Sequence, residues 1–243
     1  MDSLLYTATS GASRVLSAQQ VRSNNLSNAD TTGFRADMER ARSYAVKGHG
    51  FDGSTMVVTN SASTRFDAGD MVKTGRKLDI AINGDGFMTV QLPDGTEAYT
   101  RAGNMKLDQE GNLTINGFPV MAEGNPIVVP EYQSIEVSET GMVSVIPPGG
   151  GAELAVGQIK LVKPEINTVQ KINNGLLQAR DGNNFAADAT VRLAPEHLEG
   201  SNVSAIDELV SVMSLTRNFE MQVRMMKTAE KLAQAGNRLL RNG

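Results

Sequence analysis

Apolar residues recur at helical spacing toward the end of the chain. Between residues 203 and 243, apolar or small side chains follow alternating steps of three and four, the spacing of a coiled-coil seam. The seam consists of Val212, Leu215, Phe219, Gln222, Met226, Ala229, Ala233, Gly236 and Leu240, interrupted at Gln222 and Gly236. Flanking it are Leu209, Val223, Leu232 and Leu239, which widen the apolar face beyond what a two-stranded pairing requires. The pattern predicts a C-terminal helix with more than one neighbour.

Both ends of this predicted helix carry residues that favour helix formation. Ser204 and Asp207 form a pair similar to an N-terminal capping box, because a serine hydroxyl can accept a hydrogen bond from the amide three residues on. Acidic residues follow in the first turn, and the basic Arg238 and Arg241 lie near the last. Both placements oppose the helix dipole and strengthen the helix prediction.

A thinner apolar face begins the chain. The same three-four spacing, with mostly small side chains, runs through Leu5, Ala8, Ala12, Val15 and Gln19. We expect this helix to end in the Asn-rich segment 24–33, where asparagine and glycine favour left-handed termination. The pattern predicts an N-terminal helix that is weaker on its own than the C-terminal one.

Turn signals recur about every eight residues between residues 78 and 146. Gly, Asn and Asp cluster at 82–86, 93–95, 109–112, 116–117 and 123–125, and short β-prone runs separate the clusters. This spacing predicts antiparallel hairpins. After a flexible Pro- and Gly-rich break at 147–151, the strand pattern resumes at 157–163.

These periodicities divide the chain into four parts and predict an α+β fold. Residues 1–30 form an N-terminal helix, 31–66 an extended segment, 67–200 a β-rich domain and 201–243 a C-terminal helix. The antiparallel β-rich domain is therefore inserted between the two helices.

Composition and charge exclude several classes of function. The 243 residues contain no Cys, which removes disulfides, thiolate catalysis and cysteine-ligated metals. The formal net charge of -4 gives no overall attraction to nucleic acid or to an anionic membrane surface. No long apolar run is present, and Asp2 without a basic residue before Arg14 is unlike a secretory leader. We expect no nucleic-acid partner, no direct membrane insertion and no cleaved signal peptide.

Candidate catalytic and metal-binding residues are few. The two histidines, His49 and His197, lie far apart in the sequence, and no nucleophile elbow, P-loop or dinucleotide-binding motif occurs. The acidic turn at 108–112 resembles the start of an EF-hand loop, but Pro119 stands where the final Glu belongs, so a hairpin turn is favoured. We expect no catalytic residue, no metal, no cofactor and no small-molecule substrate.

Three segments resemble the flagellar basal-body rod and hook protein family. Residues 24–37, NNLSNADTTGFRAD, are similar to the family's N-terminal signature. Residues 78–120 contain its central pattern of Gly-x-Gly-Phe, Tyr-Thr-Arg-x-Gly and Asp-x-x-Gly-x-Leu. Residues 198–240 begin with Leu-Glu-x-Ser-Asn-Val and continue with Arg-x-Phe-Glu. The chain length and the Phe-Glu-Met-Gln at 219–222 resemble the proximal-rod members more than the distal-rod members.

The resemblance implies terminal helices packed as a coiled-coil-like layer, with the β-rich domain inserted between them. It also implies a structural subunit of the proximal rod that transmits motor torque in the periplasmic basal body. Its partners would be the flagellar type III export apparatus, other rod subunits and copies of itself. Expected subunit-interface positions are Leu5, Ala8, Ala12, Val15, Leu26, Asn28, Phe34, Leu209, Val212, Leu215, Phe219, Val223, Met226, Ala233 and Leu240.

Several alternatives are compatible with the same pattern. The seam could be a private two-helix core within one monomer. The chain could also be a distal-rod or other axial subunit, or an adaptor that binds exported subunits without entering a filament. A secreted β-rich enzyme with helical docking ends is the remaining alternative, and it lacks a recognisable catalytic constellation.

Overall fold

The chain folds into two compact units in a computed structural model. The structure describes residues 2–39, 41–45, 55–59, 63–172 and 174–241, and their side chains except at 2–6, 41–45, 55–59, 233, 236–237 and 239–241. The helical unit comprises Met1–Ala29, Ala36–Arg65 and Val203–Gly243, and the β-rich unit comprises Asp30–Arg35 and Phe66–Asn202. His49 lies outside the described residues.

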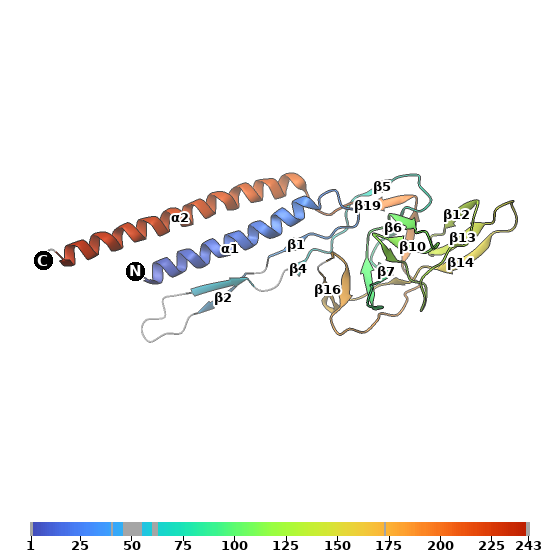
Figure 1. Cartoon of the computed structure of the whole chain (residues 1–243), viewed down its shortest axis with the longest axis horizontal. Coiled ribbons are helices and arrows are strands. Elements are labelled where there is room, and N and C mark those ends of the chain that lie inside the picture. The colour runs from blue at the N-terminus through green and yellow to red at the C-terminus, as the bar shows by residue number, and fades with distance from the viewer. Residues whose placement is uncertain (1, 40, 46–54, 60–62, 173, 242–243) are drawn as a thin grey trace. The chain divides into compact units, whose positions relative to one another are not determined.

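Two long helices dominate the helical unit. Helix α1 (Asp2–Ser27) and helix α2 (Ala205–Arg241) lie side by side and antiparallel, with the two chain ends at the same end of the pair (Figure 1). At the start of α2 the Asp207 amide donates to the Ser204 hydroxyl at 3.4 Å, so the predicted N-terminal cap is present.

Helix α1 ends within the Asn-rich segment 24–33, as predicted. At its end the Ser27 hydroxyl donates to the Ser23 carbonyl, and the Asn28 side chain donates to the Asn24 carbonyl, both at 2.9 Å. Side chains that bond to nearby carbonyls compete with the backbone ladder and favour termination. In the segment 24–33 the left-handed residue is Gly33, with φ 68°, which lies beyond the helix end. The predicted place of termination is therefore confirmed, and the left-handed residue of the segment is its glycine.

Two short antiparallel ribbons complete the helical unit. One pairs β1 (Asp37–Met38) with β4 (Ser63–Thr64), and the other pairs β2 (Ala41–Ala45) with β3 (Thr55–Thr59). The ribbons lie in the segment that the sequence predicts to be extended.

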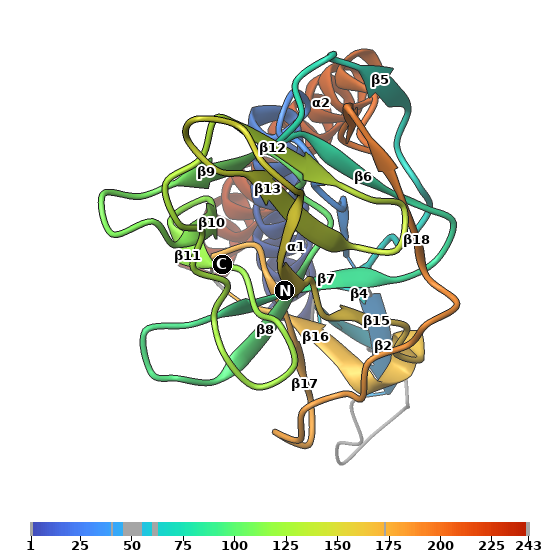
Figure 2. The ribbon, with the colours of Figure 1, turned by 90° about the vertical axis from the view of Figure 1, so that its right-hand side faces the viewer.

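The β-rich unit is built from short antiparallel strands in several small sheets (Figure 2). The largest sheet has the order β15-β7-β8-β17-β16. Its strands are β7 (Phe87–Gln91), β8 (Glu97–Thr100), β15 (Leu161–Val162), β16 (Val169–Lys171) and β17 (Leu177–Ala179). Three-stranded sheets join β9 (Met105–Leu107), β10 (Leu113–Ile115) and β11 (Phe118–Pro119), and β12 (Ser134–Val137), β13 (Met142–Ile146) and β14 (Leu154–Gln158). Strand pairs join β6 (Ile80–Asn83) to β18 (Arg192–Pro195) and β5 (Met71–Lys73) to β19 (His197–Glu199), and η1 (Ile166–Thr168) is a 3-10 turn.

Three of the five predicted turns join paired antiparallel strands. At 82–86 the flanking strands β6 and β7 lie in different sheets, and the turn at 123–125 is flanked only by an isolated bridge between Met121 and Pro126. Strands β7 and β8 flank the turn at 93–95, and β9 and β10 flank the turn at 109–112. Asn116 and Gly117 both have positive φ between β10 and β11, as a tight two-residue hairpin requires. The β-prone run after the turn at 123–125 is not a strand, because residues 127–129 form only an isolated bridge between Val128 and Asn112. The α+β class is confirmed.

Large apolar side chains fill the interior of the β-rich unit. Its main core includes Ile80, Met88, Met105, Leu113 and Val143, all fully buried. A smaller cluster contains Phe87, Tyr99, Val162 and Leu177. Strands β7 and β8 are buried on both faces, which explains why their sequences lack a clean apolar-polar alternation.

Candidate assembly surface and polar anchors

The predicted seam of α2 faces α1 within the helical unit. The Gln222 side chain lies against Gly11, where an added methyl group would meet the amide carbon at 3.2 Å. Thr9 contacts the Met226 sulfur at 3.6 Å, farther along the antiparallel pair. Gln222 had been predicted to interrupt the seam, but a glycine in the facing helix leaves room for its amide.

The other expected interface positions on or next to the helices fall into four groups. Ala8 and Ala12 are buried in α1. The half-buried side chains are Val15, Leu26, Asn28, Val212, Leu215, Phe219, Val223 and Met226, whereas Leu209 is exposed. The side chains of Leu5, Ala233 and Leu240 lie outside those the structure describes. Contact of these positions with another subunit stays a prediction.

Phe34 lies in the β-rich unit and not on a helix. Its half-buried ring is covered by the Lys171 ammonium at 3.9 Å from the ring centroid. A cation over an aromatic face is attracted by the ring quadrupole, so this interaction helps to fix the segment 30–35. The structure therefore gives Phe34 a contact within its own unit.

A second apolar face of α2 was missed by the sequence analysis. We name it the outer stripe, and it consists of the exposed Ile206, Val210, Met213, Met221, Met225 and Leu232. Arg217 and Thr228 fill the gaps in its steps of three and four. At 3.6 residues per turn, these positions lie on the side of the helix opposite the seam. The signal was present in the sequence as a second run at helical spacing.

Within the helical unit, the buried carboxylate of Glu208 links helix α2 to the last turns of helix α1. Glu208 of α2 accepts hydrogen bonds from Arg22 at 3.1 Å and from the Asn25 side chain at 3.2 Å. Asn25 also donates to the Asp37 carbonyl at 2.9 Å and accepts from the Asp37 amide at 2.8 Å. The Asn25 side chain thus donates through its amide nitrogen and accepts through its amide oxygen. An ionised Asp could only accept, and Leu could do neither. We call these residues the Glu208 anchor.

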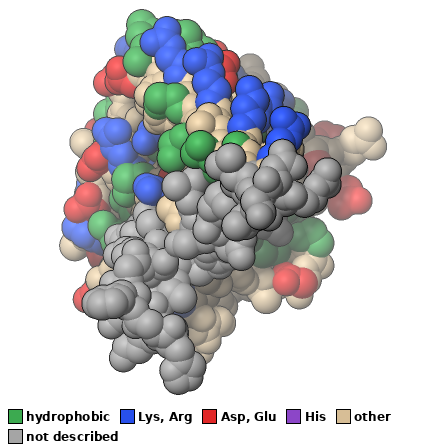
Figure 3. All heavy atoms as spheres, turned by 90° about the vertical axis from the view of Figure 1, so that its left-hand side faces the viewer, with side chains coloured by type: hydrophobic (Ala, Val, Ile, Leu, Met, Phe, Trp, Pro, Cys, Tyr) green, Lys and Arg blue, Asp and Glu red, His purple; other side chains and the backbone are tan. Residues whose placement is uncertain are grey.

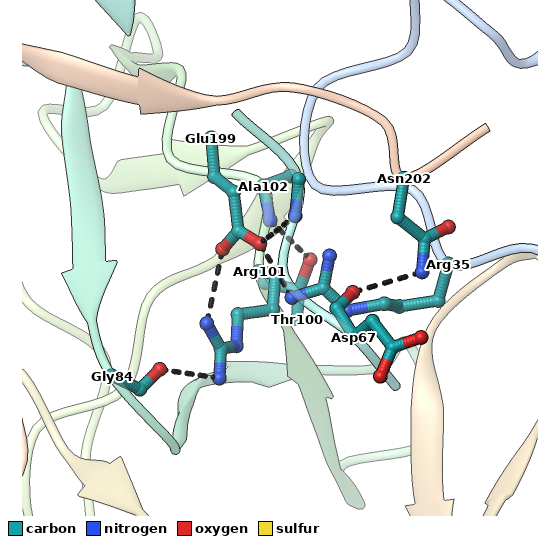
Figure 4. Close-up of polar contacts among 9 residues, drawn as sticks. Arg35, Asp67, Gly84, Thr100, Arg101, Ala102, Glu199 and Asn202 are labelled. Atoms are coloured by element: carbon teal, nitrogen blue, oxygen red, sulfur yellow. Dashed lines mark hydrogen bonds and ion pairs between the residues drawn. The ribbon is translucent and has the colours of Figure 1, made fainter. Parts of the chain in front are cut away.

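A second buried carboxylate joins three distant segments of the β-rich unit. Glu199, of which only 1% is exposed, pairs with Arg35 at 2.5 Å and with Arg101 at 3.0 Å (Figure 4). The Gly69 amide donates to the same carboxylate at 3.0 Å. The Gly33 amide donates to the Glu199 backbone carbonyl at 2.8 Å. We call this group the Glu199 anchor.

Burial and charge act in opposite directions on Arg101. Burial lowers the pKa of its guanidinium, and the Glu199 carboxylate opposes that shift by favouring the charged form. Arg101 also donates to the Gly84 carbonyl at 2.8 Å (Figure 4). Removing the carboxylate would leave two desolvated cations without their counter-charge.

Two glycines beside the Glu199 anchor permit a close approach of the backbone. A methyl group on Gly103 would lie 1.5 Å from the Ile80 carbonyl oxygen, and one on Gly33 would lie 2.3 Å from the Ala102 amide nitrogen. Gly33 also has a positive φ that disfavours other residues. Glycine is therefore required at both positions for steric reasons.

The turn at 108–112 is a hydrogen-bonded hairpin turn. The Asp108 carboxylate accepts from the Glu110 and Asn112 amides at 2.9 and 2.8 Å and from the Asn112 side chain. These donors hold the pKa of Asp108 below its usual value, with the Asn112 side chain as the largest cause. Among the described residues, no group of three or more Asp, Glu or His is placed to hold a metal. Likewise, no described helix has the length and apolar character needed to cross a membrane.

The sequence matches known flagellar proteins along its whole length. Three family models match separate segments: flagella basal body rod protein at residues 5–35, flagellar hook protein FlgE/F/G D1 domain at 81–145, and flagellar basal body rod FlgEFG protein C-terminal at 194–239. The chain is also 38% identical to the flagellar basal-body rod protein FlgF of Salmonella typhimurium, with 99% of each chain covered.

The chain belongs to the flagellar basal-body rod protein family. FlgF of Escherichia coli is likewise 38% identical, with 99% of each chain covered. FlgG of Borreliella burgdorferi is 34% identical, with 98% of each chain covered. The resemblance noted in the sequence is thus confirmed for the family, and the FlgF-like character is confirmed with it.

The two anchors connect the three matched segments of this rod protein. The first segment supplies Arg22, Asn25 and Arg35, the middle one supplies Arg101, and the last supplies Glu199 and Glu208. Each charged residue lies in or near a motif quoted for the resemblance, but its partner could not be read from the motif.

Proposed function

We propose that this protein is a structural subunit of the proximal rod, which assembles through α1 and α2 with copies of itself and with other rod subunits. The resulting helical axial structure would transmit motor torque. The observation that carries the proposal is the outer stripe, a line of exposed large apolar side chains along a helix. A continuous line of apolar side chains exposed to solvent marks an interaction site.

The energetics favour burial of the outer stripe by a neighbouring helix. Val210 and Met221 are 58% and 55% exposed. Burying a side chain of this type stabilises by about 1.5 to 3 kcal/mol, so a line of six provides enough free energy to hold a subunit. Helices of neighbouring rod subunits are the proposed occupants, because family members carry the same terminal segments. Head-to-tail contacts between like subunits generate helical structures.

Basic side chains border the outer stripe and suit an acidic neighbour. Arg217, Arg224, Lys227 and Lys231 are exposed along α2. Figure 3 shows Lys and Arg side chains in a row with hydrophobic side chains beside them. A copy of this chain carries a net charge of -4, so its surface is acidic on balance. Complementary charges would fix the orientation and register of docking more than its strength.

The remaining elements of the proposal rest on the family. We propose export through the flagellar type III apparatus and residence in the periplasmic rod. We also propose that the protein has no catalytic activity, since the relatives are named as rod proteins. The similarity to relatives named FlgF supports the proximal position over the distal one.

The test is to place a carboxylate on the outer stripe. Val210→Asp and Met221→Asp should be exported at normal levels, but they should not restore swimming to cells that lack the wild-type protein. Electron microscopy should show incomplete rods, because an unpaired carboxylate must be desolvated to enter the interface. Asn218→Asp is the matched control, since it adds the same charge on α2 without removing an apolar side chain.

The outcomes separate the proposal from its alternatives. Normal swimming with both stripe variants would show that the outer stripe is not the assembly surface. Wild-type protein that is exported but absent from purified basal bodies would favour the adaptor alternative. Leu215→Asp, on the seam that faces α1, should instead lower the helical signal of the isolated chain.

A further inference from the structure

A small pocket in the β-rich unit lies beside the Glu199 anchor. Its volume is about 20 Å³, and its lining includes Arg35, Arg101, Lys171, Phe87 and Tyr99. A cavity needs about 10–15 Å³ to hold one water molecule, so this pocket has room for a single ligand of similar size. All of its lining residues belong to the β-rich unit.

Donors in the pocket wall outnumber acceptors. Arg35 is 4% exposed and Arg101 is 6% exposed. Arg35 Nε and Nη1 and Arg101 Nε are buried and have no acceptor among the described residues. Buried N–H groups are nearly always paired, and each one left unpaired carries the full cost of its desolvation. These three N–H groups therefore require an acceptor that the described residues do not supply.

The local charge balance is positive. Two guanidinium groups share the single Glu199 carboxylate, as Figure 4 shows, and the Lys171 ammonium donates to the Arg35 carbonyl at 2.8 Å. Of the other acids, Asp85 favours the charged form of Arg101, but from an exposed position. Glu97 accepts from Lys160 at 2.8 and 2.9 Å, and the exposed Asp85 pairs with Lys163 at 3.3 Å.

The geometry points to a binding site for one small monovalent anion of the size of chloride, held by the guanidinium groups of Arg35 and Arg101. An anion accepts the unpaired N–H groups and also offsets the excess positive charge. A water molecule could accept two of these bonds but would leave the charge uncompensated.

The first test is thermal unfolding of the full chain at constant ionic strength, with chloride replacing gluconate. A ligand bound only by the folded state raises the midpoint in a saturable way, by roughly 3–6 °C at ten times its dissociation constant. Arg35→Lys keeps the charge beside Glu199 but removes two of the unpaired donors, so its midpoint should not respond to chloride. Arg192→Lys, at an exposed arginine of β18, should respond like wild type.

The second measurement does not depend on the stability of a variant. Crystals of the wild-type chain grown or soaked in sodium bromide should show an anomalous peak within hydrogen-bond distance of Arg35 Nε. Absence of this peak would overturn the proposal, and so would a midpoint equal in chloride and gluconate. A chloride response retained by Arg35→Lys would also overturn it, because the response would then arise elsewhere.

Discussion

The helical unit and the β-rich unit differ in what they bury. Among described side chains, the buried apolar residues of the helical unit are all alanines: Ala8, Ala12, Ala18, Ala36 and Ala229. The β-rich unit buries Ile, Val, Leu, Met, Phe and Tyr side chains completely. The β-rich unit therefore contains its own core of large side chains, whereas the described large apolar side chains of the helical unit stay half-buried or exposed.

Because of this difference, we expect the stability of the two units to depend differently on subunit docking. An isolated helix gains most of its stability from tertiary packing of its apolar face, and alanines supply little area for that. The helical unit should therefore gain stability when subunits dock, while the β-rich unit should be equally stable before and after. The predictions below test whether the two units differ in this way.

The largest expected effect is at the Glu199 anchor of the β-rich unit. Glu199→Gln should lower that unit's free energy of unfolding by about 3–5 kcal/mol, because Arg35 and Arg101 would be left as buried charges without a counter-ion. The measurement is urea unfolding of the full chain. Glu196→Gln is the matched control, as its pair with Lys73 at 4.0 Å is on the surface and is expected to contribute less than about 1 kcal/mol. Equal losses for both variants would refute the buried-charge argument.

The next comparison places one substitution in each unit. Leu113→Ala empties a fully buried position in the β-rich core and should cost about 2–5 kcal/mol. Leu215→Ala removes a half-buried seam side chain and should cost less than about 1 kcal/mol in the isolated chain. Circular dichroism and near-ultraviolet signals would follow the two transitions. If Leu215→Ala were as costly as Leu113→Ala, the seam would be a private two-helix core.

A smaller effect, with a pH signature, is expected at Tyr99. Burial raises the pKa of Tyr99 to about 12, and its hydroxyl donates to Glu97 at 3.2 Å and accepts from the Phe185 amide at 3.1 Å. The unfolded chain loses this proton near the ordinary tyrosine pKa of 10.0 and the folded chain only near 12, so stability should fall as the pH rises between these values.

Tyr99→Phe should therefore flatten the alkaline fall in stability. It should also cost about 1–3 kcal/mol at neutral pH, because the Phe185 amide would lose its acceptor. Unfolding midpoints measured from pH 7 to 12 test both effects, with the exposed Tyr132→Phe as control. An unchanged alkaline slope in Tyr99→Phe would mean that another group titrates.

Local signals were enough to predict much of the fold. The helices follow from three-four spacing and a capping serine, and the hairpins follow from turn residues such as Asn116 and Gly117, because both depend on neighbours in sequence. The strand pairs β5–β19 and β6–β18 were not predicted. They join residues more than 100 positions apart, and no local pattern specifies such a pairing.

The candidate site was harder to predict from the sequence, because it too depends on contacts between residues far apart in the chain. Arg35 and Glu199 are 164 residues apart, so their motifs could be recognised without showing that they form one ion pair. Amphipathic spacing located the seam of α2 but not the outer stripe, whose Leu232 was placed beside the seam, and it could not say which face α1 covers. That assignment needed the contact of Gln222 with Gly11.

The most direct test of the central claim is hydrogen exchange of backbone amides, measured on the isolated full chain and on assembled rods. In the isolated chain, amides of α1 and α2 should exchange far faster than those of β7 and β8, since the buried apolar side chains described in the helical unit are alanines. In assembled rods the helical amides should become as protected as the strands. Protection of α2 in the monomer equal to that of β7 would contradict the account.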